Sequence, residues 1–110
     1  MPTSAADVRA IALALEGASE IDHFGRAAFR TKRRIFVSVD SKTGRANIVL
    51  PRERMEFLLE AAPDVFTRHF WGKTIYMLAE LARLERKELE ALIREAWDHA
   101  APAKPKRRGR

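Results

Sequence analysis

The sequence predicts an α+β domain in which helices pack on one face of an antiparallel sheet, in the order α-β-β-β-α-β-α. Two observations support this prediction. Residues 24–50 contain short runs in which apolar and polar side chains alternate, as they do along half-buried strands. Three other segments instead repeat apolar residues at spacings of three and four, which is the period of an amphipathic helix.

The first helical segment follows Ser4. An acid three residues after it, Asp7, is the arrangement of a capping box. Four apolar residues then follow at the spacing of one helical face: Val8, Ile11, Ala12 and Leu15. Gly17 is placed to end the helix in a left-handed conformation. Residues 18–23 are expected to be a connector, with a short edge strand as the alternative.

The next stretch, residues 24–50, predicts three strands. Val, Ile and Phe alternate with polar residues in residues 35–39 (IFVSV) and in residues 46–50 (ANIVL). Between them, residues 41–44 (SKTG) have the composition of a turn, in which Gly44 is free to adopt a positive φ. This stretch also holds most of the cations of the chain.

After the strands, the period of the apolar residues changes at Pro51. Proline suits the first turn of a helix, where its missing N–H leaves no hydrogen bond unmade. The helical stripe that follows consists of Met55, Leu58, Leu59 and Ala62. Pro63 ends this second helix, because the residue before a proline is disfavoured in the helical conformation.

The last segment is ambiguous between a strand and a helix. Residues 71–77 alternate like a strand, although MLAELARLERKELEALIREAWDHA as a whole also favours one long helix. Starting that helix early would place Glu85 on its apolar face. We therefore predict a strand that ends near Leu81 or Ala82 and a helix that begins near Leu84 or Glu85. The buried stripe of this helix is expected to be Leu89, Leu92, Ile93 and Ala96, with Trp97 beside it in the core.

Length and composition fit one domain, which we place at residues 1–102, since 46% of the 110 residues are hydrophobic. The chain has no cysteine, which excludes disulfides, thiolate catalysis and cysteine-ligated zinc. No run of about 18 apolar residues and no signal-peptide core is present, so we expect a soluble cytoplasmic protein without membrane association. Residues 103–110, rich in cations and proline-flanked, are expected to form a disordered tail.

The net charge of +6 is distributed unevenly. Residues 26–54 contain nine cations against two acids, and residues 101–110 contain five cations and no acid. Residues 1–25 and residues 55–100 each carry three more acids than cations. A concentrated positive region on a slightly acidic body favours a polyanionic partner more than uniform basicity would.

Several landmarks, taken in their order and spacing, resemble one family over about residues 8–102. They are VRAIALALEGASE, HFGRAAFR, NIVLP, WGKTIYM and LIREAWDHAAP. The chain resembles the MmcQ/YjbR family, small bacterial proteins usually labelled DNA-binding and having a CyaY-like fold. The resemblance implies a helix, a three-stranded antiparallel meander, a second helix, a further strand and a C-terminal helix. It also implies hairpins that act as paired wings on DNA.

Catalytic and metal-binding patterns are absent from the sequence, so we expect no enzyme, no cofactor and no metal. His23, His69 and His99 lie far apart without the spacing of a zinc site. His99 closes the last helix, where a cation meets the negative end of the helix dipole favourably. Residues 72–74 (GKT) resemble the end of a phosphate-binding loop, but the glycine that this loop needs five residues earlier is Thr67. The acids around the first helix are too few for a frataxin-like iron site.

The hairpin cations are the candidate binding residues. Strand alternation predicts that Arg30 and Lys32 project together, and Lys32 and Arg33 fall in the turn between the first two strands. We expect phosphate contacts, on duplex DNA with RNA as an alternative, from Arg26, Arg30, Lys32, Arg33, Arg34, Lys42, Arg45 and Lys73. The basic tail is expected to add to them, and a monomer is favoured. The competing interpretation is that these are solvated charges that keep sheet edges from pairing.

A second hypothesis concerns aromatic residues. Phe66, Phe70 and Trp71 cluster before the predicted fourth strand and would line a groove between sheet and helix. Such a groove would make the chain a non-enzymatic module that binds a protein or a small ligand. The same side chains could equally serve the core, because burying each contributes about 1.5–3 kcal/mol.

Overall fold

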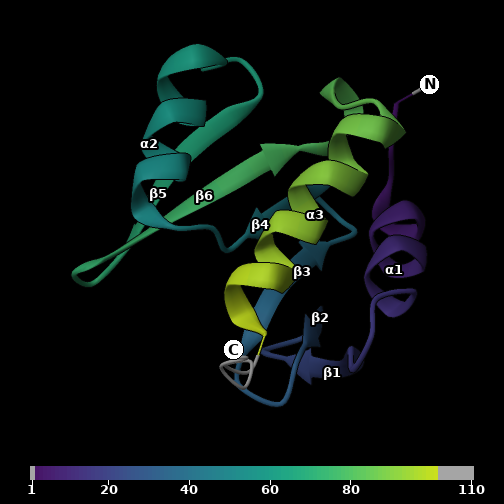
Figure 1. Cartoon of the computed structure of the whole chain (residues 1–110). Coiled ribbons are helices and arrows are strands. Elements are labelled where there is room, and N and C mark those ends of the chain that lie inside the picture. The colour runs from purple at the N-terminus through teal and green to yellow at the C-terminus, as the bar shows by residue number, and fades with distance from the viewer. Residues whose placement is uncertain (1, 102–110) are drawn as a thin grey trace, which may run out of the picture.

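The computed structural model describes residues 2–101, so Met1 and residues 102–110, with the basic tail, lie outside the described part. Three helices and a six-stranded sheet make up the fold (Figure 1). The helices are α1 (Ala5–Leu13), α2 (Arg52–Ala61) and α3 (Arg86–Ala100). The strands are β1 (Ser19–His23), β2 (Arg26–Arg30), β3 (Ile35–Asp40), β4 (Arg45–Ile48), β5 (Phe66–Trp71) and β6 (Thr74–Glu80). A short 3-10 turn, η1 (Leu81–Arg83), joins β6 to α3.

The sheet is antiparallel throughout and has the order β1-β2-β3-β4-β6-β5, which confirms the α+β class. The predicted order of elements did not include two of these six strands. One is β1, where a short strand was the alternative to a connector. The other is β5, which forms a hairpin with β6 around Gly72 and Lys73. Gly72 adopts a φ of 62°, so this glycine makes the two-residue turn, and the predicted strand starts at Thr74.

The register of the strands assigns side chains to two faces of the sheet. Phe29 pairs with Val37 and Val37 with Ile48, and all three are fully buried. They belong to one core cluster with Val8 and Ile11 of α1 and with buried residues of α3 such as Leu89 and Ile93. Glu56 of α2 forms an ion pair with Arg68 of β5. Arg68 is the cross-strand neighbour of Met77 in β6, which is buried, so the two side chains lie on the same face of the sheet. All three helices therefore pack on the same face of the sheet, which we call the helix face. The opposite face of the sheet is called the second face.

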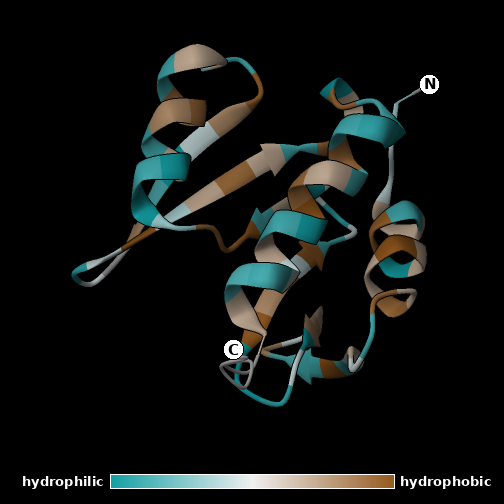
Figure 2. Cartoon of the chain, in the orientation of Figure 1, coloured by the Kyte–Doolittle hydropathy of each residue, from teal (hydrophilic) through white to brown (hydrophobic). Residues whose placement is uncertain are grey.

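The helix predictions are confirmed at the start of α1 and at α3, whereas α1 ends at Leu13 with Ala14 as its C-cap, before Leu15 and before Gly17, which was predicted to end it. Ser4 and Asp7 form the expected capping box, and the stripe of α1 is buried at Val8, Ile11 and Ala12. For α3, Glu85 is the N-cap and the whole predicted stripe is buried. Hydrophobic and hydrophilic residues alternate in bands around α3, as expected of a helix that covers a sheet with one face (Figure 2).

The second helix also begins and ends where its prolines predict, with Pro51 at the N-cap and Ala62 at the C-cap. None of its residues is fully buried; α2 packs mainly on the β5 end of the sheet and is joined to α3 by the ion pair between Arg54 and Glu95 (Figure 1). Trp97 packs against the core, and its Nε1 donates to the Glu16 carbonyl at 2.8 Å, as its structural assignment predicted.

Candidate nucleic-acid interface

The structure separates the eight predicted binding cations into three places. Arg30, Lys32, Arg33 and Arg34 lie at the turn between β2 and β3, and we call these four residues the turn cluster. Arg26, Lys42 and Arg45 lie at the opposite end of the same strands, because β2 and β3 run antiparallel. Lys73 is exposed at the tip of the β5–β6 hairpin, which extends from the body on the side away from α1 (Figure 1).

The turn that holds the turn cluster is organised by Thr31. Its side chain is 3% exposed, and its Oγ1 donates to the carbonyl of Ala100, the last residue of α3, at 2.7 Å. The same oxygen accepts hydrogen bonds from the backbone N–H groups of Arg33 at 3.1 Å and Arg34 at 3.4 Å. The backbone N–H of Thr31 closes the turn by donating to the Arg34 carbonyl at 3.0 Å.

Two guanidinium groups complete the contact with α3. Arg34 Nη2 donates to the carbonyl of His99 at 2.9 Å, and Arg33 Nη1 donates to that of Ala101 at 3.1 Å. With Ala100, three successive carbonyls at the end of α3 thus receive donors from the turn. These carbonyls have no partner within the helix and form the negative end of its dipole, so cations are favourable here.

Within the turn cluster the four side chains differ in their freedom. Arg34 is half-buried, and its Nε is buried without a hydrogen-bond partner, so this residue is committed to the helix end. Arg30 donates to the carbonyls of Thr31 and Lys32, which folds its guanidinium over the turn. Lys32 and Arg33 are exposed. Because β2 ends at Arg30, the strand alternation expected to align Lys32 with Arg30 does not reach Lys32.

No carboxylate of residues 2–101 forms an ion pair with any member of the turn cluster. Several cations elsewhere are paired, for example Arg45 with Glu80 at 3.1 Å and Arg54 with Glu95 at 2.9 Å. The positive charge at the turn is therefore left uncompensated by the described acids.

The same positive charge acts on His99. Burial is the main cause that lowers the pKa of this imidazole below its usual range, and the positive charges of Arg34 and Arg33 lower it further. His99 lies in the last turn of α3 as expected, but its lowered pKa disfavours the cationic form of the ring. Arg34 and Arg33 supply positive charge to the helix dipole, and they oppose protonation of the neighbouring ring.

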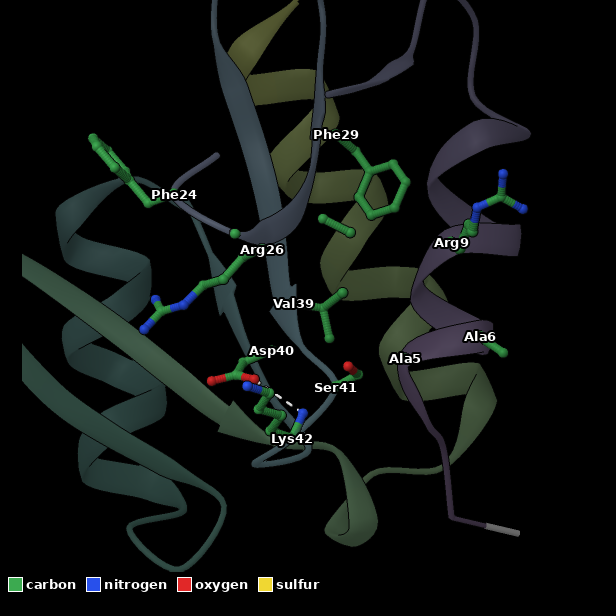
Figure 3. Close-up of a pocket in the computed structure, with 12 residues that line it drawn as sticks. Ala5, Ala6, Arg9, Phe24, Arg26, Phe29, Val39, Asp40, Ser41 and Lys42 are labelled. Carbon is green, nitrogen blue, oxygen red and sulfur yellow. Dashed lines mark hydrogen bonds between the residues drawn. The ribbon is translucent and has the colours of Figure 1, made fainter. Parts of the chain in front are cut away.

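At the opposite end of β2, Arg26 and Lys42 are exposed and form no ion pair among the described residues. They line a cavity of about 440 Å³ beside Phe24, Asp40 and Ser41. Figure 3 shows Phe24 and Arg26 pointing away from α1, whereas Phe29 points toward it. The carboxylate of Asp40 accepts the backbone N–H of Lys42 at 2.9 Å.

The predicted aromatic groove is not formed by its predicted residues. Phe66 is 5% exposed and belongs to the core, so it cannot line an open groove. Phe70 is 61% exposed on β5. The side chain of Trp71 is outside the described part of the structure.

The described residues contain no group of three or more His, Asp or Glu side chains placed to hold a metal ion. None of the helices described here is long and apolar enough to cross a membrane.

The family model of YjbR matches residues 13–99, which is most of the chain. The chain belongs to the YjbR family. Among solved structures, this YjbR-family chain is similar to the crystal structure of Deinococcus radiodurans protein DR2400, which contains a DUF419 domain. The two share 20% sequence identity with a TM-score of 0.72, over 87% of this chain and 79% of the other, so the likeness concerns the fold. No curated protein matches the chain.

Two residues of this YjbR-family chain were not predicted from the sequence to belong to the candidate site. Thr31 organises the turn cluster, and the sequence offers no signal for this because its partner Ala100 is 69 residues away. Phe24 could have been found, since an aromatic residue followed by Gly25 at a hairpin turn departs from the usual Asn-Gly or Asp-Gly.

Proposed function

We propose that this YjbR-family protein binds duplex DNA through its phosphates, without strong sequence preference. The turn cluster is the primary contact in this proposal. Its support is that four cations adjoin one another at a single turn and lack carboxylate partners among the described residues. Phosphate binding requires only such cations on an accessible surface, and counterion release then supplies the affinity.

The hydrogen bonds of Thr31, Arg33 and Arg34 to α3 support the same proposal. A turn that is fixed to a helix end loses little conformational freedom when it meets a ligand, so less of the binding energy is spent on ordering it. Lys32 and Arg33 are the exposed members that would reach phosphates. Arg34 acts as a positioning residue in this account.

The basic tail is the second contact that we propose. Ala101, the last described residue, accepts a hydrogen bond from Arg33. The five tail cations, Lys104, Lys106, Arg107, Arg108 and Arg110, follow Ala101 in the sequence. The proposed activity is binding alone, without catalysis or a cofactor, and the site of action that we propose is the cytoplasm.

Fluorescence anisotropy with a labelled DNA duplex tests the proposal. Lys32→Glu should weaken binding to every duplex sequence alike and reduce the steepness of its salt dependence by at least about one unit. The matched control is Lys87→Glu, which makes the same charge change at an exposed residue of α3. Residue 87 lies 13 residues before Ala100, about 20 Å along the helix. Equal losses from both variants would contradict a defined site and indicate only a response to net charge.

A further inference from the structure

The tip of the β1–β2 hairpin carries a residue that the turn itself does not favour. Phe24 and Gly25 form the two-residue turn, since His23 pairs with Arg26, and their φ angles are 55° and 82°. Two positive φ angles are the mark of a type I′ turn, whose first position is usually Asn, Asp or Gly. Phenylalanine there pays a steric cost that a smaller polar residue avoids.

Burial does not compensate for that cost. Phe24 is 91% exposed, and its ring makes a T-shaped contact with the neighbouring His23 ring, with centroids 4.6 Å apart. Another exposed aromatic, Phe57, is 59% exposed and lies beneath the guanidinium of Arg54 at 5.6 Å. The described contacts of Phe24 thus give no folding reason for an aromatic ring at this strained position. Strain of this kind points to a function of the side chain.

The surroundings of Phe24 favour an anionic ligand with a flat group. Phe24 is among the residues that line a cavity of about 440 Å³, but its ring points away from the α1 side of that cavity and lies open to solvent, where a flat group can reach it (Figure 3). Arg26 and Lys42 supply two cations against the single carboxylate of Asp40, while Arg9 on the α1 side is paired with Glu20 at 2.8 Å. The excess of one positive charge attracts phosphate only weakly, so the ring must supply part of the affinity.

We infer that Phe24 stacks on an unpaired base of a bound nucleic acid, with Arg26 and Lys42 holding the adjoining phosphates. Aromatic rings that emerge among cations are the usual means of binding unpaired bases, whose faces are hidden inside a duplex. This inference rests on the proposed function and narrows its ligand to duplex DNA that carries a single-stranded segment.

The geometry of β2 connects the two contacts. Arg26 and Arg30 share the second face of the sheet, since they pair with His23 and Ser19 of β1 at even spacing. Four residues of strand separate them by about 13 Å. A duplex held at the turn cluster would therefore place a single-stranded extension along β2 toward Phe24.

The experiment compares three labelled DNA probes of the same sequence: a blunt duplex, the same duplex with a single-stranded overhang, and the single strand. The wild-type protein should bind the overhang probe most tightly. Phe24→Asn removes the ring and favours the turn, so its thermal unfolding temperature should stay equal or rise. This variant should lose about five- to 150-fold in affinity for the overhang probe, as expected for one stacked base. Its affinity for the blunt duplex should be unchanged.

Two controls sharpen the result. Phe24→Tyr keeps a stacking ring and should retain the overhang preference, and Phe57→Asn removes an exposed ring elsewhere and should have no effect. The inference is overturned if Phe24→Asn keeps the overhang preference, or if it weakens blunt-duplex binding equally. Either result leaves the proposed function standing as long as Lys32→Glu still weakens duplex binding. Absence of salt-dependent duplex binding by the wild type would instead overturn the proposed function itself, and this inference with it.

Discussion

Thr31 Oγ1 donates a hydrogen bond to the carbonyl of Ala100 at 2.7 Å, across 69 residues of sequence. Through this bond the turn between β2 and β3 is attached to the end of the C-terminal helix. Arg33 and Arg34 strengthen the attachment on either side of it. The cations that we propose as a DNA contact therefore sit on a turn that the core holds in place.

Replacing Thr31 by Val should destabilise the fold. The substitution leaves the buried Ala100 carbonyl without its donor and two backbone N–H groups without their acceptor, at a cost of about 1–3 kcal/mol. Urea denaturation of the variant and of Thr31→Ser, which retains the hydroxyl, measures the effect. A Thr31→Val protein as stable as the wild type would show that this bond contributes nothing to the free energy of unfolding.

Removing the charge of Arg34 should raise the pKa of His99. The positive charges of Arg34 and Arg33 lower that pKa together with burial, so Arg34→Gln removes one of the causes. The NMR titration of the His99 ring protons should therefore shift to higher pH in this variant than in the wild type. No shift would mean that the guanidinium does not act on the ring.

Protonation of His99 should also destabilise the protein. Because its pKa is lower in the folded than in the unfolded chain, the unfolded state binds more protons near the usual histidine pKa of about 6.5. The free energy of unfolding should therefore rise as the pH increases through this region and fall again on acidification. In His99→Gln this contribution should disappear from the pH dependence. An unchanged profile in that variant would contradict the assignment.

Deleting residues 103–110 should weaken binding to duplex DNA and leave the fold intact. The deletion removes five cations, so both affinity and salt dependence decrease, but the turn cluster should still bind. The thermal unfolding temperature is the control for folding. Complete loss of binding in this variant, together with no effect of Lys32→Glu, would assign the attraction to the tail alone.

Local patterns in the sequence predicted most of the fold. The caps and stripes of α1 and α3 depend on residues three or four apart, and these were confirmed at Ser4, Asp7 and the buried face of α3. The strand β5 was missed because its exposed polar residues, such as Arg68 and His69, obscure the alternation. Its existence depends on pairing with β6 around Gly72, which only the folded hairpin makes evident.

The candidate site was less predictable, because it depends on contacts between distant segments. The sequence identified the candidate cations but did not predict how the fold separates them. The fold places Arg26 and Arg34 at opposite ends of the strands and gives Arg34 a partner on α3. Such a partner cannot be read from local sequence, since the two residues are 65 positions apart.

The salt dependence of duplex binding tests the central claim most directly. If about five phosphates are neutralised, the logarithm of the association constant should fall with the logarithm of salt concentration at a slope near −4.5. Lys32→Glu should make this slope shallower by about one unit or more, whereas Lys87→Glu should leave it unchanged. A wild-type slope near zero, or identical slopes in both variants, would contradict phosphate binding at the β2–β3 turn.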